Sequence, residues 1–160
     1  MADAKIYADL KADHDRHRDL IARIEDTSRK DEERRELFEE LRKELQAHAA
    51  AEEEALYSVM LANPELRDEA RHSVSEHKEV DDLLGELTDK DSSSLFWMSK
   101  FKSMRERYLH HIEEEEEEMF PAATEELSAE QEAQIAKVFE RRKPKELERA
   151  ETEKPGDERE

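Results

Sequence analysis

The sequence contains no cysteine, so disulfide bonds, thiolate metal ligands and thiol catalysis are excluded. Glycine and proline are scarce, with 2 and 4 residues in a chain of 160. Because these two residue types disfavour helices, and because Glu, Lys, Arg, Ala and Leu are abundant, the composition predicts an almost wholly helical protein. A chain of this length is sufficient for one domain with a hydrophobic core, but hardly for two.

The sequence also lacks a long hydrophobic run and an excess of basic residues. No apolar stretch approaches the roughly 20 residues of a membrane-spanning helix, and no signal peptide is visible. We therefore expect a cytoplasmic protein with no membrane partner. Asp and Glu number 46 against 27 Lys and Arg, which gives a formal net charge of −19. Because no basic stripe stands out that could neutralise phosphates, we expect no nucleic-acid partner.

Intrinsic disorder is the alternative interpretation of a chain in which 46% of the residues are charged. Against it stands a regular pattern of apolar residues at three-four spacing, which extends from about residue 6 to residue 139. Polar or proline-containing breaks at 27–31, 63–64 and 89–94 divide this pattern into four helices. Pro121 is expected to close the fourth.

A shorter fifth helix is predicted after the fourth. Ser128 and Gln131 have the spacing of a capping box at its start, and Pro144 is expected to end it. The residues beyond Pro144 are charged and lack apolar periodicity, so they are predicted to form a disordered or loosely helical tail. The expected organisation is a four-helix bundle, a short C-terminal helix and a charged tail, at residues 1–124, 125–143 and 144–160.

An internal repeat relates the two halves of the bundle. A shift of 63 residues, without a gap, superposes His14 on His77, His48 on His111, Glu52 on Glu115 and Tyr57 on Phe120. This repeat predicts two helix hairpins of common design, at about 5–60 and 68–123, in an all-α, up-down-up-down four-helix bundle. The predicted turns lie midway between successive histidines, so the four histidines should lie in one layer.

Both halves contain His-x-x-x-Glu, at residues 48–52 and 111–115. Four residues make about one helical turn, so each His and its Glu lie on the same helix face. Buried carboxylates that face each other need neutralising cations, and these nitrogen and oxygen donors suit iron, manganese or zinc. We expect one histidine pair from each hairpin to hold one ion and the two glutamates to bridge the ions: His14 with His48, His77 with His111, and Glu52 with Glu115.

These residues, together with the ending Glu118-Met119-Phe120-Pro121, resemble the hemerythrin-like, or HHE cation-binding, family over roughly residues 5 to 123. The resemblance implies a hemerythrin-like bundle with a non-haem di-iron centre. Its two Fe ions would be bridged by carboxylates and by an oxo or hydroxo group, with Zn or Mn as the less favoured metals. Family members carry or sense oxygen, store or sense iron, or process peroxide or nitric oxide, so these small molecules are the expected ligands.

One position departs from the pattern of oxygen-carrying hemerythrins. Their fifth histidine would fall at Ser73, and His72 lies five residues before His77, on another part of the helix surface. The resemblance then implies an open position on both irons, so reaction with or sensing of oxygen, peroxide or nitric oxide, with catalase- or peroxidase-like activity, is favoured over oxygen carriage. The alternative is a metal-dependent iron or oxygen sensor or storage module without turnover. A helical interaction protein without metal is a third hypothesis.

Several other side chains near the layer are either further ligands or neighbours of the ligands. His17 is expected to pack beside a ligand, and His110 to ligate only if it pairs with Glu114 in a shifted register. Tyr57 is expected in the core above the site, with donation to bound peroxide as the alternative. The other glutamates of 113–118 are expected on a solvated face, unless one of them hydrogen-bonds a ligand imidazole.

Overall fold

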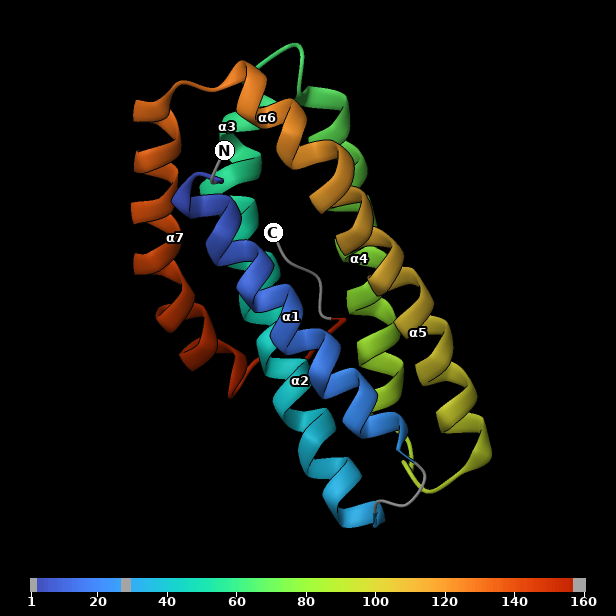
Figure 1. Cartoon of the computed structure of the whole chain (residues 1–160). Helices are drawn as coiled ribbons and strands as arrows, with labels where there is room; N and C mark the ends of the chain where they lie inside the picture. The colour runs from blue at the N-terminus through green and yellow to red at the C-terminus, as the bar shows by residue number, and fades with distance from the viewer. Residues whose placement is uncertain (1–2, 27–29, 157–160) are drawn as a thin grey trace.

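The computed structural model describes residues 3–26 and 30–156 (Figure 1). These residues form helices, turns and irregular segments, with no strand among them, which confirms the predicted all-α class. The helices are α1 (Lys5–Glu25), α2 (Asp31–Glu52), α3 (Ser58–Leu61), α4 (Arg67–Thr88), α5 (Leu95–Glu114), α6 (Phe120–Glu126) and α7 (Ala129–Ala150), with π-helical segments η1 (Glu53–Tyr57) and η2 (Glu115–Met119).

The long helices form the expected antiparallel hairpins, α1 with α2 and α4 with α5 (Figure 1). The N-cap of α5 is Ser94, whose hydroxyl accepts from the Trp97 backbone N–H, at the predicted third turn. Of the predicted first turn, residues 27–29 lie outside the described part of the chain. Within the described ranges, no helix combines the length and the apolar character that crossing a membrane requires.

Two π-helical segments let the second and fourth helices of the bundle continue past the His-x-x-x-Glu motifs. The Ser58 N–H donates to the Glu53 carbonyl and the Phe120 N–H to the Glu115 carbonyl, each five residues back. The repeat pairs Ser58 with Pro121, which has no N–H to donate. The π-helical hydrogen bond of the second half is therefore made by Phe120, one residue before the position equivalent to Ser58. The prediction that Pro121 closes the helix is therefore wrong: the ladder is already interrupted there, and α6 continues beyond it.

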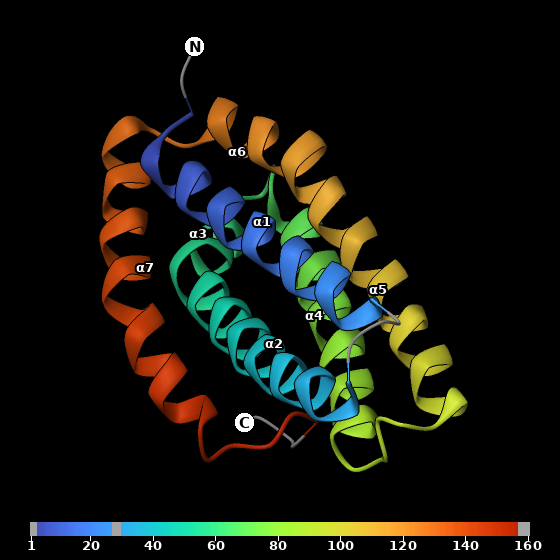
Figure 2. The same ribbon diagram turned by 60° about the horizontal axis from the view of Figure 1, so that its bottom comes forward.

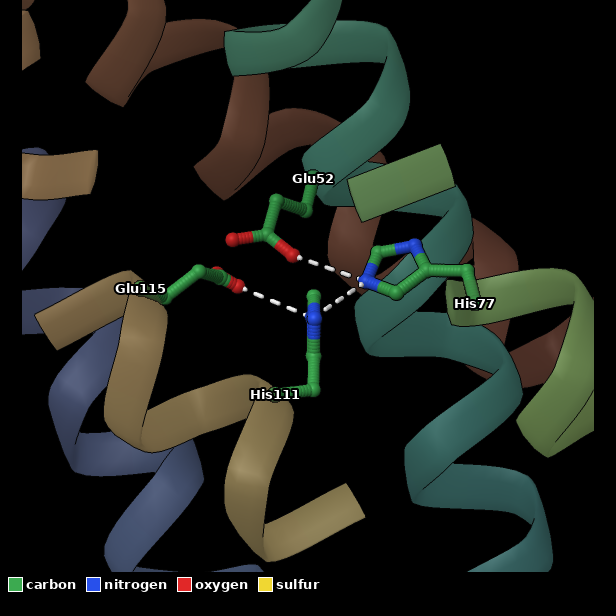
Figure 3. Close-up of side chains that lie close together, drawn as sticks. All are labelled: Glu52, His77, His111 and Glu115. Atoms are coloured by element: carbon green, nitrogen blue, oxygen red, sulfur yellow. Dashed lines mark hydrogen bonds and ion pairs between the residues drawn. The ribbon is translucent and has the colours of Figure 1, made fainter. Parts of the chain in front are cut away.

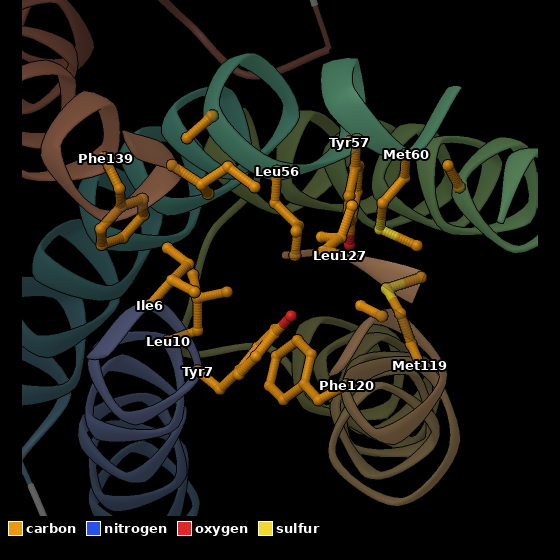
Figure 4. Close-up of a cluster of buried hydrophobic side chains, with 14 of the residues drawn as sticks. Ile6, Tyr7, Leu10, Leu56, Tyr57, Met60, Met119, Phe120, Leu127 and Phe139 are labelled. Carbon is orange, nitrogen blue, oxygen red and sulfur yellow. The ribbon is translucent and has the colours of Figure 1, made fainter. Parts of the chain in front are cut away.

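A layer of buried polar side chains divides the hydrophobic core into two clusters. One cluster contains Leu10, Leu56 and Phe120 (Figure 4), and the other contains Leu41 and Trp97. All five side chains are almost fully buried. Apolar packing above and below the layer thus fixes the helices that carry the polar residues.

The fifth helix, α7, lies along the side of α1 and α2 (Figure 2). The predicted capping box of Ser128 and Gln131 is present at its start. The predicted end at residue 143 is wrong, because α7 continues through Pro144 to Ala150. Proline removes one helical hydrogen bond, and packing against α2 offsets this loss: Arg42 Nη1 donates to the Ala150 carbonyl at 3.0 Å.

The predicted disordered or loosely helical tail is helical at residues 145–150, as part of α7. The segment after α7 crosses from α2 to α4. The Gly156 N–H donates to Asp81 Oδ2 at 2.8 Å, and a Cβ on Gly85 would lie 2.8 Å from the Pro155 carbonyl oxygen. Gly156 has a φ of +84°, a conformation that favours glycine. Residues 157–160 of the predicted tail lie outside the described part of the chain.

Candidate metal centre

The six residues predicted as ligands meet in the buried polar layer. None of them exposes more than 9% of its surface. The ring centroids of His14 and His48 are 5.1 Å apart, and those of His77 and His111 are 4.8 Å apart. Each hairpin therefore contributes one histidine pair, as the repeat predicts.

The first donor set contains His77, His111, Glu52 and Glu115 (Figure 3). The two Nε2 atoms of His77 and His111 are 3.1 Å apart. Glu52 Oε1 lies 3.3 Å from His77 Nε2, and Glu115 Oε2 lies 3.1 Å from His111 Nε2. The four donor atoms lie within 4.8 Å of one another, so one metal ion can contact all of them.

The second donor set contains His14, His48 and Glu52, again within 4.8 Å of one another. His48 Nε2 lies 3.5 Å from Glu52 Oε1, and His14 Nε2 lies 3.9 Å from Glu115 Oε1. Glu52 belongs to both sets, and Glu115 reaches from the first set towards the second. This placement is the one that two bridging carboxylates require; the ligation itself stays a prediction.

The other ring nitrogen of each histidine, Nδ1, faces a carboxylate outside the layer. The Nδ1–carboxylate distances are 2.8 Å for His48, 3.0 Å for His111, 2.7 Å for His14 and 3.7 Å for His77. An Nδ1–H that donates to a carboxylate fixes the ring orientation and leaves Nε2 free to bind a metal. The four carboxylates, in the same order, belong to Asp13, Glu76, Glu116 and Glu53.

The four outer carboxylates follow the same 63-residue repeat as the inner residues. Asp13 pairs with Glu76 and Glu53 with Glu116 in the sequence, and each is the direct neighbour of a predicted ligand. Each carboxylate contacts a histidine on another helix. Its place next to a predicted ligand in the sequence therefore does not predict which histidine it contacts. The repeat is the signal that could have found them, and Glu116 fulfils the alternative role of a glutamate bonded to a ligand imidazole.

Several nitrogen and oxygen atoms of the predicted ligands are buried and have no hydrogen-bond partner among the described residues. They are Nε2 of His14 and His48, Oε2 of Glu52 and Oε1 of Glu115. Leaving a buried polar atom unpaired costs about 1–3 kcal/mol. A cation would satisfy these atoms, and imidazole with carboxylate suits iron, manganese or zinc. The residues therefore fit a metal centre.

Without a metal, protons supply the positive charge of the layer. Burial lowers the pKa of His48, but its hydrogen bond to Asp13 and the nearby carboxylate of Glu52 outweigh burial and raise that pKa to about 9. Burial likewise lowers the pKa of His111, but the charge of Glu115 and bonds to Glu115 and Glu76 raise it to about 10. Metal ions and protons thus compete for the same nitrogen atoms.

A profile of the hemerythrin HHE cation-binding domain matches residues 5–123 of the chain. The chain belongs to this family. No curated protein and no solved structure matches it. Family and geometry together establish a cation-binding HHE domain with a buried His and Glu cluster that suggests a metal site.

The two donor sets of the HHE domain differ in one aromatic residue. The Tyr57 hydroxyl lies 3.0 Å from Glu52 Oε1 and 3.1 Å from Glu115 Oε2, beside His77. Burial and the charges of Glu115 and Glu52 hold the pKa of Tyr57 well above its usual value, so the hydroxyl keeps its proton. The repeat places Phe120 against His14 at the other position, where it offers no hydroxyl.

A pocket of about 250 Å³ leads from the surface of the HHE domain to Glu115, one helical turn beyond His111. Ser73, at the position of the missing fifth histidine, lines it together with Glu115 and Met119. Ser73 is small, so this part of the layer stays reachable from outside. The remaining lining residues are polar or charged: Asp68, Glu69, His72, Glu114 and Glu118.

The opposite, His14–His48 side of the layer is covered by α7. Lys143 Nζ lies 2.8 Å from Asp13 Oδ2, and Asp13 in turn bonds His48. Lys143 also lies 3.5 Å from Glu44 Oε2. Sequence reasoning missed this contribution of α7, because no spacing in the sequence links Lys143 to a ligand.

The remaining histidines weighed from the sequence lie outside the donor sets. His17 is buried beside the layer, and its Nδ1 is 2.6 Å from the Tyr108 hydroxyl. Burial and the neighbouring His48 hold the pKa of His17 well below its usual value. His110 and His72 are exposed, and His110 Nε2 pairs with Glu114 Oε1 at 2.9 Å on the surface. His110 thus pairs with Glu114, but on the surface. The helix does not have the shifted register that would place His110 in the buried layer.

Proposed function

We propose that the HHE domain holds two iron ions and reacts with or senses oxygen, peroxide or nitric oxide, with catalase- or peroxidase-like activity as the favoured chemistry. The observation that carries this proposal is the pair of donor sets that share Glu52 and are both approached by Glu115. Iron bound there supplies a Lewis acid and one-electron redox chemistry.

The chain's own residues would orient a small ligand and supply a proton. Tyr57 Oη carries a hydroxyl proton between Glu52 and Glu115, and one hydroxyl can donate to only one acceptor at a time. A ligand that arrives through the pocket beside Ser73 would compete with Glu52 and Glu115 for this proton. The apolar clusters above and below the layer would exclude bulk water.

The alternative function, a sensor or storage module without turnover, is supported by the contact between α7 and the layer. Asp13 bonds both His48 and Lys143, so an ion at His48 would influence the position of α7 through one carboxylate. Binding of metal to such a site is coupled to folding and can act as a switch. In this case metal would change the stability and conformation of the chain without turnover of peroxide.

Metal content and the ultraviolet-visible spectrum of protein from iron-supplemented cells test the proposal first. The expected result is about two irons per chain, as two donor sets require, with near-ultraviolet bands that change when peroxide is added. A single zinc ion per chain, or no metal under any reconstitution, would overturn the di-iron centre.

Peroxide turnover then separates the two functions. Oxygen release or donor oxidation by the iron-loaded chain, lost in Tyr57→Phe with the iron content unchanged, supports catalysis with Tyr57 as proton donor. Iron-dependent changes in melting temperature without turnover support the sensor. Glu117→Ala, at an exposed glutamate of the same acidic run, is the matched control.

A further inference from the structure

The HHE domain carries a second set of His-x-x-x-Glu spacings on its surface. His72 and Glu76 are one turn apart on α4, and His110 and Glu114 are one turn apart on α5. His72 Nε2 lies 3.4 Å from Glu76 Oε1 and 3.5 Å from Glu114 Oε2. These three donor atoms lie within 4.8 Å of one another, the same limit that the buried sets meet.

This surface set is not a by-product of the repeat that builds the buried layer. The repeat places Asp9, Asp13 and Ala51 opposite His72, Glu76 and Glu114 in the first half of the chain. Alanine cannot ligate a metal and the imidazole is missing, so the first half has no equivalent set. The set is therefore a feature of the second hairpin alone.

The pocket described above connects the surface set to the buried layer. His72 and Glu114 line its outer part and Glu115 its inner part. Glu115 is 1% exposed and belongs to the first buried donor set. A buried carboxylate at the end of an open pocket is a destination for a cation.

Further carboxylates line the pocket: Asp68, Glu69 and Glu118. No lysine or arginine in the described part of the chain forms an ion pair with any of the three. Burial, and after it the charge of Glu118, raises the pKa of Glu69. A concave surface lined by one sign of charge concentrates counter-ions and speeds their capture.

We propose that His72 Nε2, Glu76 Oε1 and Glu114 Oε2 form a divalent-cation site, termed the rim site, which captures ferrous ion and passes it through the pocket to Glu115. Its role in loading rests on the proposed function of the buried centre. One imidazole and two carboxylates bind ferrous ion, and water completes the coordination. His72 is 63% exposed in its side chain, so the ion stays exchangeable and can move on.

Glu76 belongs both to the rim site and to the surroundings of the buried layer. Its Oε1 is 3.0 Å from His111 Nδ1, and a carboxylate can accept several bonds at once. Substitution of Glu76 would therefore disturb His111. The test uses His72 and Glu114, whose side chains form no hydrogen bond or ion pair with a predicted ligand in the described part of the chain.

The first experiment measures the rate of ferrous uptake by the full-length, metal-free chain under anaerobic conditions. Ferrous ion is mixed in limiting amount, and unbound iron is trapped with a colorimetric chelator after increasing times. In H72A/E114Q we expect uptake to slow by about tenfold or more, with the final iron content unchanged. Raising the salt concentration should slow uptake by the unsubstituted chain and affect the double variant less.

E79Q is the matched control for this experiment. Glu79 is an exposed residue of α4 that pairs with Arg107, and its substitution removes one negative charge, as H72A/E114Q does. We expect E79Q to take up iron at the unsubstituted rate. Equal rates in the unsubstituted chain and H72A/E114Q, or equal slowing in E79Q, would overturn the rim site as the route of loading.

The second experiment separates failure of the rim site from failure of the buried centre. Mn(II) is titrated into the iron-loaded chain and into the metal-free chain, and free Mn(II) is followed by electron paramagnetic resonance. We expect one weak, exchangeable site that H72A/E114Q lacks in both titrations. If the buried centre takes up no iron, the Mn(II) titration of the metal-free chain still tests the rim site. If H72A/E114Q binds Mn(II) as the unsubstituted chain does, the rim site is overturned.

Discussion

The two hairpins build equivalent halves of one polar layer, but they cover it differently. In the first half Asp13 bonds His48 and is itself held by Lys143 of α7. In the second half the equivalent Glu76 bonds His111 and faces exposed His72 at the rim of a pocket. The repeat thus duplicates the arrangement of donor residues, whereas α7 covers the His14–His48 set and leaves the other set uncovered.

The aromatic residues sharpen this difference between the halves. Tyr57 brings a hydroxyl to the open side, and Phe120 stacks on His14 at the closed side. Two ion positions with equivalent donors can therefore differ in what reaches them and in which position has a proton donor. A reactive ligand is expected at the His77–His111 side.

The largest effect is expected from Glu52→Ala, because Glu52 alone belongs to both donor sets. We expect loss of both ions, with affinity lowered by more than the roughly 100-fold that removal of an outer partner causes. Glu115→Ala should weaken the ion at His77 and His111 more than the other. Metal content after dialysis against a chelator measures both variants, and Glu117→Ala is the control. Retention of two ions in Glu52→Ala would show that it does not bridge.

Asp13→Asn and Glu76→Gln compare the outer carboxylates of the two halves. Each should lower the affinity of one ion by about 10–100-fold, because the histidine loses the acceptor that orients it. Asp13→Asn should cost more, since it also removes one of the two carboxylate partners of Lys143. Competition with a metal chelator measures the two affinities. Equal losses would mean that α7 adds nothing to the closed side.

The pH dependence of the metal-free chain tests the exchange of protons for metal. His48 and His111 have folded pKa values of about 9 and about 10, above the roughly 6.5 of an unfolded histidine. The folded state therefore binds more protons, so this stability is full below about pH 6.5 and is lost as the pH rises through 9 to 10. At about 1.4 kcal/mol per pKa unit, these shifts correspond to a loss of about 3 kcal/mol for each histidine between pH 6 and pH 9.

Thermal or denaturant unfolding of the metal-free chain at a series of pH values measures this loss. The metal-loaded chain is the control, because bound metal replaces the protons and should reverse the trend. Metal binding should add more stability at pH 9 than at pH 6. If the metal-free chain became more stable from pH 6 to pH 9, His48 and His111 would not be the protonated residues that stabilise the layer.

The smallest effect is expected from Gly85→Ala, which tests the segment that joins the covered half to α4. The added Cβ would meet the Pro155 carbonyl, so residues 151–156 should leave α4. The change in global stability should stay within about 1 kcal/mol, because alanine also favours the helix. Hydrogen exchange of residues 151–156 measures the release, with Ser75→Ala on the exposed face of α4 as the control. Unchanged protection would mean that the contact at Gly85 does not hold the segment.

Much of the bundle follows from local sequence pattern. Apolar spacing gave the helices, and the capping residues Ser94 and Ser128 marked two of their starts. The predicted helix ends at Pro121 and Pro144 were wrong. Whether a proline ends a helix depends on whether the surrounding structure compensates for the hydrogen bond that it removes. Pro121 lies where a π turn has already interrupted the ladder, and Pro144 lies in a helix that packs on α2.

The sequence by itself determined the six residues of the layer, because a repeat and a one-turn spacing constrain residues on the same face of paired helices. Only the tertiary structure decided which carboxylate holds which imidazole, since those bonds join different helices. It also decided that α7 covers the Asp13 side and that a pocket opens beside Ser73. Contacts between distant segments depend on packing, which no periodicity in one chain encodes.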